Sequence, residues 1–239
     1  YRWVWLGEAI GVDELIYYMF SDRHRQKPDP DRRYDRIYIG GDYGQQNATT
    51  FEAFGLDTYR KKFPGLGEYY HSGRESGRQK SPSEYARDLV EFMDELHEQY
   101  ENRIFYIFLD PSAKGLAEEV KRATRTGLDY QVLLRDAEND VALGISRVQK
   151  ALVFDIMSIS PKQEYAVQEF GTYEYDKKSI EKGKEVPVKE ADHCMDAIRY
   201  VVMGAWSKIK HWLPKDETPE EIDICDISSR EVREEDEYL

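Results

Sequence analysis

Three aspartates stand at positions where a carboxylate needs a chemical reason. Asp42 ends a β-rich run directly after two glycines, whose missing side chains let another group approach the backbone. Asp110 ends the most hydrophobic run of the chain, where an unpaired carboxylate is costly. Asp196 lies in the first turns of an expected helix. If the two strands are neighbours and the helix packs against their ends, the three carboxylates converge.

Converging carboxylates repel one another, and the arrangement becomes favourable when cations neutralise it. Hard oxygen ligands favour Mg²⁺ or Mn²⁺ over zinc. Two such ions about 3.5–4 Å apart clamp a phosphodiester, so that one activates the attacking water and the other stabilises the leaving oxygen. His193 precedes Asp196 by three residues, so both can project from one helical face, where His193 could ligate a metal or move a proton.

Each of these residues also has a plain structural interpretation. Asp42 beside glycine is typical of a turn, and Asp110 before a proline is typical of a strand end. Asp196 could favour the helix dipole, Asp192 could cap the helix, and His193 could be a surface or capping side chain. The specific signal is the order of the three acids, which runs strand end, strand end, helix.

The elements that must position these acids follow from periodicity and turn signals. The order predicted is three antiparallel strands, then helix, strand, helix, strand, helix, a β-hairpin and a last helix. The expected ranges are strands over 36–44, 48–56 and 67–76, a helix over 81–100, a strand over 103–110, a helix over 114–126, a strand over 130–134, a helix over 141–152, the hairpin over 172–188 and the helix over 192–210. The sequence therefore predicts an α/β fold with a mixed central sheet and a parallel crossover.

Composition divides the chain of 239 residues into three parts. Residues 1–33 are expected to be an N-terminal lead-in and linker, because a polar, proline-containing stretch follows the first twenty residues. Residues 34–212 are expected to form the domain, and residues 213–239 an acidic C-terminal tail. The chain lacks a starting Met, so we expect a fragment whose upstream part has been removed.

Charge leaves a nucleic-acid partner open without supporting it. The net charge is −13, but the segment from Lys215 to Leu239 holds eleven acids and three bases, which leaves −5 for the rest.

Cys194 and Cys225 specify neither a disulfide framework nor a zinc site, so a reducing cytoplasm is the simpler interpretation. No apolar run approaches the ~20 residues of a membrane span, so no membrane partner is expected.

Three motifs together carry a family resemblance. The segments GGDYGQQNATTFEAFG, FYIFLDPSAKG and EADHCMDAIRYVV closely resemble the nuclease domain of the large terminase subunit of tailed bacteriophages, a ribonuclease H-like fold. The resemblance covers roughly residues 36–206, with the motifs in the family order. It implies Asp42, Asp110 and Asp196 as catalytic aspartates that bind two divalent cations, Mg²⁺ or Mn²⁺, with His193 as an accessory active-site residue.

The resemblance also implies a biological task. The chain would cut concatemeric duplex DNA, with little sequence specificity, at the start and end of headful packaging in the host cell cytoplasm. The family's ATPase domain would lie upstream, because no G-x-x-x-x-G-K-[ST] phosphate loop occurs in this chain. The portal protein and the small terminase subunit are the expected partners. Expected phosphate contacts come from basic residues of a loop and of the hairpin: Arg74, Arg78, Lys80, Lys182 and Lys184.

Two other functions compete. Another ribonuclease H-like nuclease, of the Holliday-junction resolvase or transposase type, shares strand-end and helix acids, and only the contexts of the acids and the choice of substrate discriminate. A non-catalytic module that keeps the fold and docks to a portal predicts no metal binding, which the clustered acids argue against.

Overall fold

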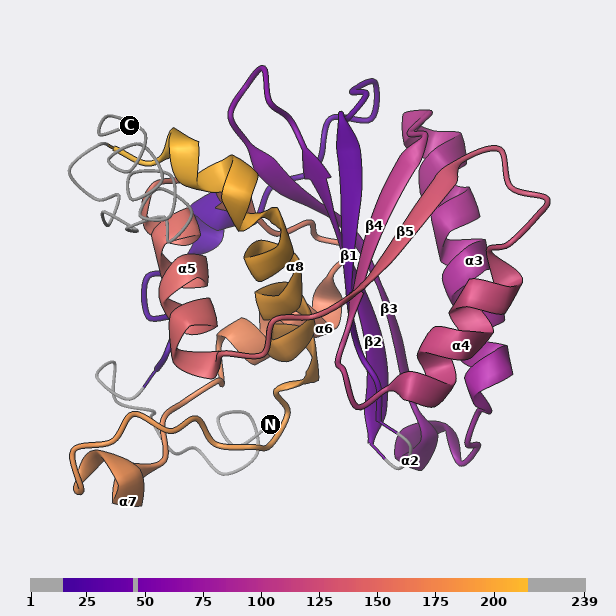
Figure 1. Ribbon diagram of the computed structural model, residues 1–239. Coiled ribbons are helices and arrows are strands. Elements are labelled where there is room, and N and C mark those ends of the chain that lie inside the picture. Colours follow the sequence, from indigo (N-terminus) through magenta and orange to yellow (C-terminus); the bar gives the residue numbers. More distant parts are fainter. Residues whose placement is uncertain (1–14, 45–46, 215–239) are drawn as a thin grey trace, which may run out of the picture.

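The computed structural model describes residues 15–44 and 47–214, which form a six-stranded sheet with helices on both faces (Figure 1). The strand order is β5-β4-β1-β2-β3-β6. The strands are β1 (Arg36–Asp42), β2 (Ala48–Leu56), β3 (Phe63–Ser72), β4 (Ile104–Leu109), β5 (Gln131–Asp136) and β6 (Met157–Ser158).

Strand directions make the sheet mixed. β1, β2 and β3 pair antiparallel as a meander, whereas β4 is parallel to both β1 and β5. The predicted first hairpin and the predicted parallel crossover are therefore confirmed. In the crossover, α4 connects β4 to β5 as parallel pairing requires.

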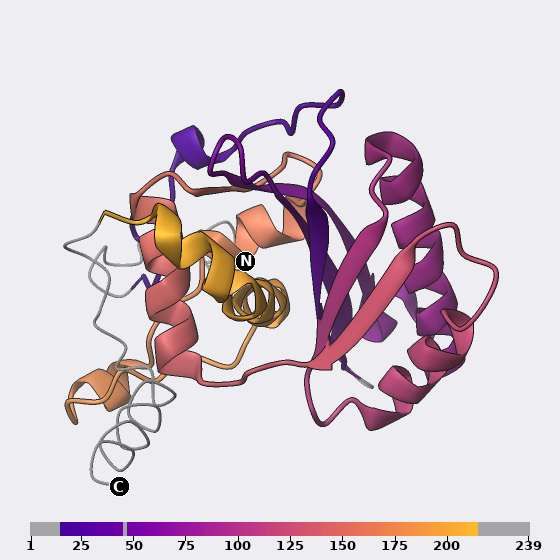
Figure 2. The ribbon, with the colours of Figure 1, turned by 45° about the horizontal axis from the view of Figure 1, so that its top comes forward.

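Helices cover the two faces unequally (Figure 2). α3 and α4 lie on one face, while α5, α6 and α8 lie on the other. The helical segments are η1 (Asp22–His24), α2 (Gly73–Ser76), α3 (Pro82–Tyr100), α4 (Lys114–Ala123), α5 (Val141–Val153), α6 (Glu164–Phe170), α7 (Lys177–Ile180), α8 (His193–Ile209) and η2 (Lys210–Trp212). The predicted class, a mixed sheet between helices, is confirmed.

Alternation along the central strands produces two separate cores. Ile37 and Ile39 of β1 face α3 and α4, where Leu89 of α3 packs. Tyr38, between them, faces the other way and packs in the cluster that contains Val201 of α8. Because both faces are covered, the middle strands are apolar almost without interruption, which is the pattern that the run before Asp110 displays.

Residues at its N-terminus determine where α3 begins. The Ser81 hydroxyl accepts the backbone N–H of Glu84, and the Glu84 carboxylate accepts the backbone N–H of Ser81. Pro82 occupies the first turn. This capping box is the one that the sequence predicts, and such a cap contributes about 1 kcal/mol.

Several elements differ from the prediction. β3 begins at Phe63 and not at residue 67, because Asp57 and Lys62 pair across a short turn that leads directly into the strand. β6 and α6 were not predicted, because each is too short for a periodic signal. The expected hairpin keeps only one antiparallel bridge, Tyr175 to Pro187, and a turn of helix, α7, begins directly after its first arm.

Residues ahead of the expected domain start pack onto the domain. Ile16 and Tyr17 are buried in the same core cluster as α5 and α8, and His24 lies under Leu152, whose carbonyl is 3.0 Å from Nε2. Residues 1–14 and 215–239 lie outside the described residues, so the first part of the lead-in and most of the acidic tail remain expectations. None of the helices within 15–44 and 47–214 has the length and hydropathy of a bilayer span.

Candidate active site

Two of the three aspartates lie side by side because of strand register. β1 and β4 are parallel neighbours, with Gly41 opposite Leu109. Asp42 follows Gly41 and Asp110 follows Leu109, so the two aspartates are also opposite each other. Side chains at paired positions of parallel strands point to the same face of the sheet. Both side chains therefore lie at the carboxyl ends of β1 and β4, on the face of the sheet that α8 covers.

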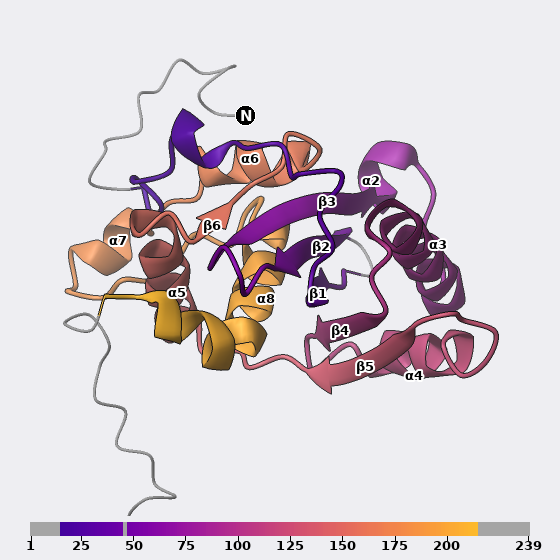
Figure 3. The ribbon, with the colours of Figure 1, turned by 90° about the horizontal axis from the view of Figure 1, so that it is seen from above.

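α8 brings the third aspartate and the histidine to that edge. Gly40 has no side chain, and the α8 backbone at Ala197 occupies the space that a Cβ would need. The helix consequently runs close against β1 and β2 (Figure 3). His193, its first residue, lies with Nδ1 2.7 Å from Oδ2 of Asp42, and Asp196 follows one turn later.

Asp196 is held by a buried arginine. Arg199 Nη2 donates to Asp196 Oδ1 at 2.7 Å, and Nη1 donates to Asn139 Oδ1 at 3.1 Å. Only 1% of Arg199 is exposed, and its Nε has no hydrogen-bond partner. Burial lowers the pKa of Arg199, but the attraction of Asp196 outweighs it and leaves that pKa raised. The guanidinium is thus a fixed positive charge beside the site.

Asp110 is held by neutral donors. The Tyr200 hydroxyl donates to its Oδ2 at 2.9 Å, Asn139 Nδ2 donates at 3.2 Å, and the backbone N–H of Ser112 donates to Oδ1 at 2.7 Å. Burial raises the pKa of Asp110, but the bonds from Ser112 and Tyr200 and the charge of Arg199 reverse this, so the pKa is lowered. The lowered pKa favours the ionised carboxylate, which is the form that can ligate a cation.

Asp42 and His193 respond differently to the same bond. Burial raises the pKa of Asp42, and although His193 lowers it, the charges of Asp196 and Asp110 raise it further. The hydrogen bond to Asp42 raises the pKa of His193 despite burial. Burial is thus the main cause at Asp42 and the hydrogen bond the main cause at His193, and a bound cation would favour the ionised form of Asp42.

A second acidic cluster lies one strand further along the same face. Glu52 of β2 lies opposite Glu68 of β3. Among the described residues, these two carboxylates and the Cys194 thiol form a group in which one possible ligand atom of each lies within 4.8 Å of the others. Protein donors already satisfy these carboxyls: Thr50 and Gln163 donate to Glu52, and two backbone N–H groups of α6 donate to Glu68. We therefore regard this cluster as a buried hydrogen-bonded network.

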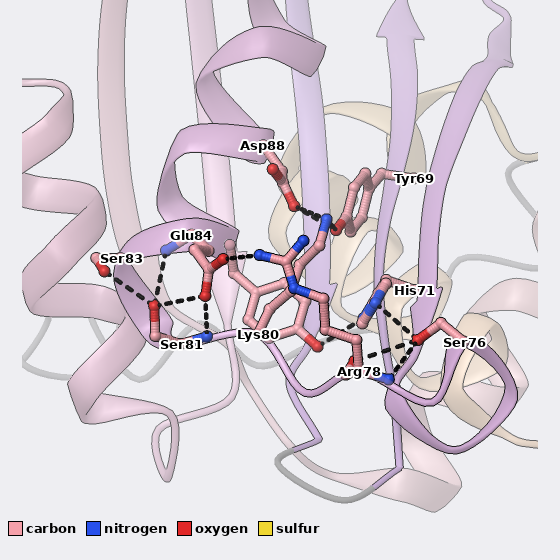
Figure 4. Close-up of polar contacts among 10 residues, drawn as sticks. Tyr69, His71, Ser76, Arg78, Lys80, Ser81, Ser83, Glu84 and Asp88 are labelled. Carbon is pink, nitrogen blue, oxygen red and sulfur yellow. Dashed lines mark hydrogen bonds and ion pairs between the residues drawn. The ribbon is translucent and has the colours of Figure 1, made fainter.

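The basic residues singled out from the sequence have different surroundings. Arg78 pairs with Glu84, and the Lys80 ammonium lies 2.6 Å from Asp88 and 3.2 Å from the Tyr69 hydroxyl (Figure 4). Arg74 is exposed on α2, and Lys182 and Lys184 are exposed just after α7. The paired cations at 78 and 80 therefore carry less free charge than the sequence suggests.

Three residues of the site were not singled out from the sequence. Arg199 and Tyr200 follow Asp196 by three and four positions, a spacing that places them on one helical face with it, so the helical pattern could have identified them. Asn139 lies in the connection between β5 and α5, and no sequence signal marks it. Asp192 occupies the N-cap position as expected, but its side chain makes no capping hydrogen bond.

Comparisons with known proteins agree on the fold. No family model matches this chain, and no curated protein matches it. The large terminase of a thermophilic bacteriophage, solved in complex with ATP-γ-S, is 33% identical with a TM-score of 0.68, and the match covers 79% of this chain and 45% of that one. The chain thus spans less than half of that terminase structure.

Two nuclease domains match over nearly their whole length. That of the phage P22 large terminase is 16% identical with a TM-score of 0.61, over 80% of this chain and 92% of that one. The large terminase nuclease of another thermophilic phage, G20c, solved with bound magnesium, is 17% identical with a TM-score of 0.51, over 79% and 96%. The resemblance seen in the sequence motifs is therefore confirmed: this chain is similar to phage large terminases and has the ribonuclease H-like fold of their nuclease domains.

Proposed function

We propose that this chain is the nuclease domain of a phage large terminase and cuts duplex DNA with divalent cations. The observation that carries the proposal is the meeting of Asp42 and Asp110, at adjacent strand ends, with Asp196 from a helix that packs on the same face. The 33% identity to the large terminase solved with ATP-γ-S supports the family, and the nuclease domains of P22 and G20c support the fold.

The donor set fits hard cations. Asp42, Asp110 and Asp196 offer carboxylate oxygens. Burial raises the pKa of Asp42, and the charges of Asp196 and Asp110 raise it further, so a nearby positive charge would favour its ionised form. The G20c nuclease was solved with bound magnesium and with bound cobalt. Two divalent cations in such a site supply the Lewis acidity that phosphodiester hydrolysis needs.

The neighbours of the aspartates have distinct tasks in this proposal. Tyr200 and Asn139 fix the carboxylate of Asp110 by donating hydrogen bonds. Arg199 fixes Asp196 and adds positive charge where the negative charge of a cleaved phosphate develops. His193, whose pKa Asp42 raises, can hold a proton close to the site and release it to a departing oxygen.

The biological task in the proposal is cutting of concatemeric DNA at initiation and termination of headful packaging. The partners would be an ATPase domain of the same polypeptide, a portal protein and a small terminase subunit, in the cytoplasm of the host cell. Because no base-reading helix stands out, cutting should show little sequence preference. Arg74, Lys182 and Lys184 are exposed cations proposed to meet DNA phosphates, so activity should fall with salt.

Plasmid cleavage tests the proposal. With Mn²⁺ or Mg²⁺, supercoiled plasmid should become nicked and then linear, and each of Asp42→Asn, Asp110→Asn and Asp196→Asn should abolish cutting with the fold retained. Asp94→Asn is a matched control, since Asp94 bonds to Tyr130 away from the site. Full activity in all three site variants would disprove the site.

Substrate choice separates the rival nucleases. A resolvase would cut a four-way junction far faster than linear duplex, whereas a packaging nuclease should cut both at similar rates. A strong preference for the junction would favour the resolvase interpretation.

A further inference from the structure

A basic hollow lies on the active-site face of the sheet and extends from the start of β1, the end away from Asp42, to the position of Phe108 on β4. Three cations from three elements line it: Arg36 at the start of β1, Arg135 on β5 and Lys208 in the last turn of α8. The cavity volume is about 380 Å³. The floor is aromatic, with Tyr38 and Tyr106 stacked at 5.2 Å between ring centroids.

The cations of the hollow are available to a ligand. Within residues 15–44 and 47–214, Arg36, Arg135 and Lys208 form no ion pair with a carboxylate, and Arg135 and Lys208 are exposed. The Arg36 guanidinium lies 5.4 Å from the centre of the Tyr106 ring, which holds its planar fork in place. Elsewhere in the described chain, many cations are paired with nearby acids, as Lys80 is with Asp88.

Two acids also border the hollow. Asp136 and Glu138 follow Arg135 toward the connection that holds Asn139, and Glu138 lies 3.8 Å from Arg147. The positive charge is therefore concentrated at the end formed by Arg36 and Lys208.

The hollow and the aspartates share one face of the sheet. Tyr38, Gly40 and Asp42 are two residues apart along β1, and Tyr106, Phe108 and Asp110 are two residues apart along β4. Each set therefore lies on one face of the sheet, the face that α8 covers. Arg135 is opposite Phe108 and points the same way. Arg36 and Asp42 are the two ends of β1, which at about 3.3 Å per residue places them roughly 20 Å apart.

We propose that the basic hollow binds backbone phosphates of the DNA duplex several base pairs from the point of cleavage. A duplex advances about 3.4 Å per base pair, so the roughly 20 Å to Arg36 corresponds to about six base pairs beyond the scissile phosphate, with Arg135 nearer to it. One guanidinium group binds two phosphate oxygens through two parallel hydrogen bonds. Because the Tyr106 ring already orients Arg36, this side chain loses little conformational freedom on binding. The proposal rests on the proposed function, because it takes duplex DNA as the substrate.

The test measures binding separately from cutting. Fluorescence anisotropy of a labelled duplex of about 30 base pairs, in EDTA, compares the wild type with the triple variant Arg36→Gln/Arg135→Gln/Lys208→Gln over a range of salt. Each lost phosphate contact should weaken binding roughly eight-fold at about 0.1 M salt and reduce the slope of log affinity against log salt by about 0.9. The matched control is Lys121→Gln/Arg122→Gln/Arg125→Gln, on and just after α4, on the opposite face of the sheet.

The outcomes separate the two proposals. Weaker binding and a smaller salt slope in the hollow variant, with the control like the wild type, support the site. Equal binding by the hollow variant and the control overturns it, and would leave the hollow to an acidic protein partner. A wild type that neither binds nor cuts DNA would instead reject the proposed function.

Single variants guard against a folding defect in the triple variant. Arg135→Gln and Lys208→Gln alter exposed side chains, so each should fold normally and still weaken binding several-fold. In plasmid cutting with Mn²⁺ both should raise KM with little change in kcat, because the hollow does not touch the reacting phosphate. A fall in kcat at unchanged KM would contradict a binding role.

Discussion

Gly40 of β1 and Ala197 of α8 meet backbone to backbone, so closely that a Cβ on Gly40 would lie 2.0 Å from the Ala197 carbonyl oxygen and 2.8 Å from Val201 Cγ2. This contact sets the height of α8 above the sheet. Because Asp42 lies two residues after Gly40 and Asp196 directly precedes Ala197, the same contact sets how closely the two carboxylates approach.

Gly40→Ala should both destabilise the protein and impair cutting. The neighbouring atom is backbone, which cannot rotate away, so α8 must move; overpacking of this kind costs about 3 kcal/mol. Chemical denaturation measures the loss in the free energy of unfolding, and plasmid cutting measures the loss of activity. The matched control is Gly115→Ala in α4, where the nearest atom is 3.9 Å away and alanine should stabilise the helix by about 0.5–1 kcal/mol. Wild-type stability and activity in Gly40→Ala would contradict this account of the site.

Tyr200→Phe should slow cutting more than it destabilises the fold. The change removes the hydroxyl that donates to Asp110 at 2.9 Å, so the carboxylate loses a positioning bond and its pKa rises. We expect about a ten-fold lower kcat, a weaker apparent metal affinity and an acidic limb of the pH profile moved upward; a bond to a charged group contributes about 1.5–3 kcal/mol.

The control for that variant is Tyr130→Phe. Its hydroxyl donates to Asp94 at 2.6 Å, so the same type of bond is lost on the other face of the sheet. It should lower stability comparably and leave kcat and the metal requirement unchanged. Equal kinetic effects of the two variants would show that Tyr200 acts only through stability.

Divalent cations should stabilise the folded protein. A cation that binds the three aspartates and not the unfolded chain adds about 2.7 kcal/mol at one hundred times its Kd. Thermal or chemical unfolding with and without Mn²⁺ measures the effect, which Asp42→Asn should greatly reduce. Glu52→Gln should keep it, because that carboxyl is already bonded to Thr50 and Gln163. Loss of the stabilisation in Glu52→Gln alone would move the metal site to the second cluster.

Stability should fall as pH rises from about 4.5 to about 8 because of Glu169. Burial raises the pKa of Glu169 to about 8, although the N–H groups of Cys194 and Met195 donate to it. The folded protein keeps a proton that the unfolded chain releases near its ordinary pKa of about 4.3, so this contribution is complete below that pH and is lost by about pH 8.

Glu169→Gln isolates the effect. The variant should lose a slope of at most about 1.4 kcal/mol per pH unit in the free energy of unfolding across this window. Glu98→Gln, an exposed position on α3, removes the same type of side chain as a control. An unchanged slope in Glu169→Gln would show that Glu169 is already ionised in the folded protein.

Much of the fold follows from local patterns. The apolar run before Asp110, the capping box at Ser81 and the helical period after Asp192 each specify an element through neighbours only a few residues away, and each appears as predicted. The hairpin predicted over 172–188 does not form a full ladder and keeps one bridge, between Tyr175 and Pro187. Its alternating side chains have no continuous buried face to pack against, so nothing holds a longer strand pairing in register.

Residue types and local patterns alone identified the side chains that could do chemistry, which are aspartates at two strand ends and near the start of a helix. Their approach to one another depends on the pairing of β1 with β4 and on the missing side chain of Gly40, contacts between segments more than sixty residues apart. The hydrogen bond of Asn139 to Asp110, and the meeting of Arg36, Arg135 and Lys208 in one hollow, were likewise decided only by tertiary structure. Periodicity reports the face of a single element, whereas packing between elements decides which faces meet.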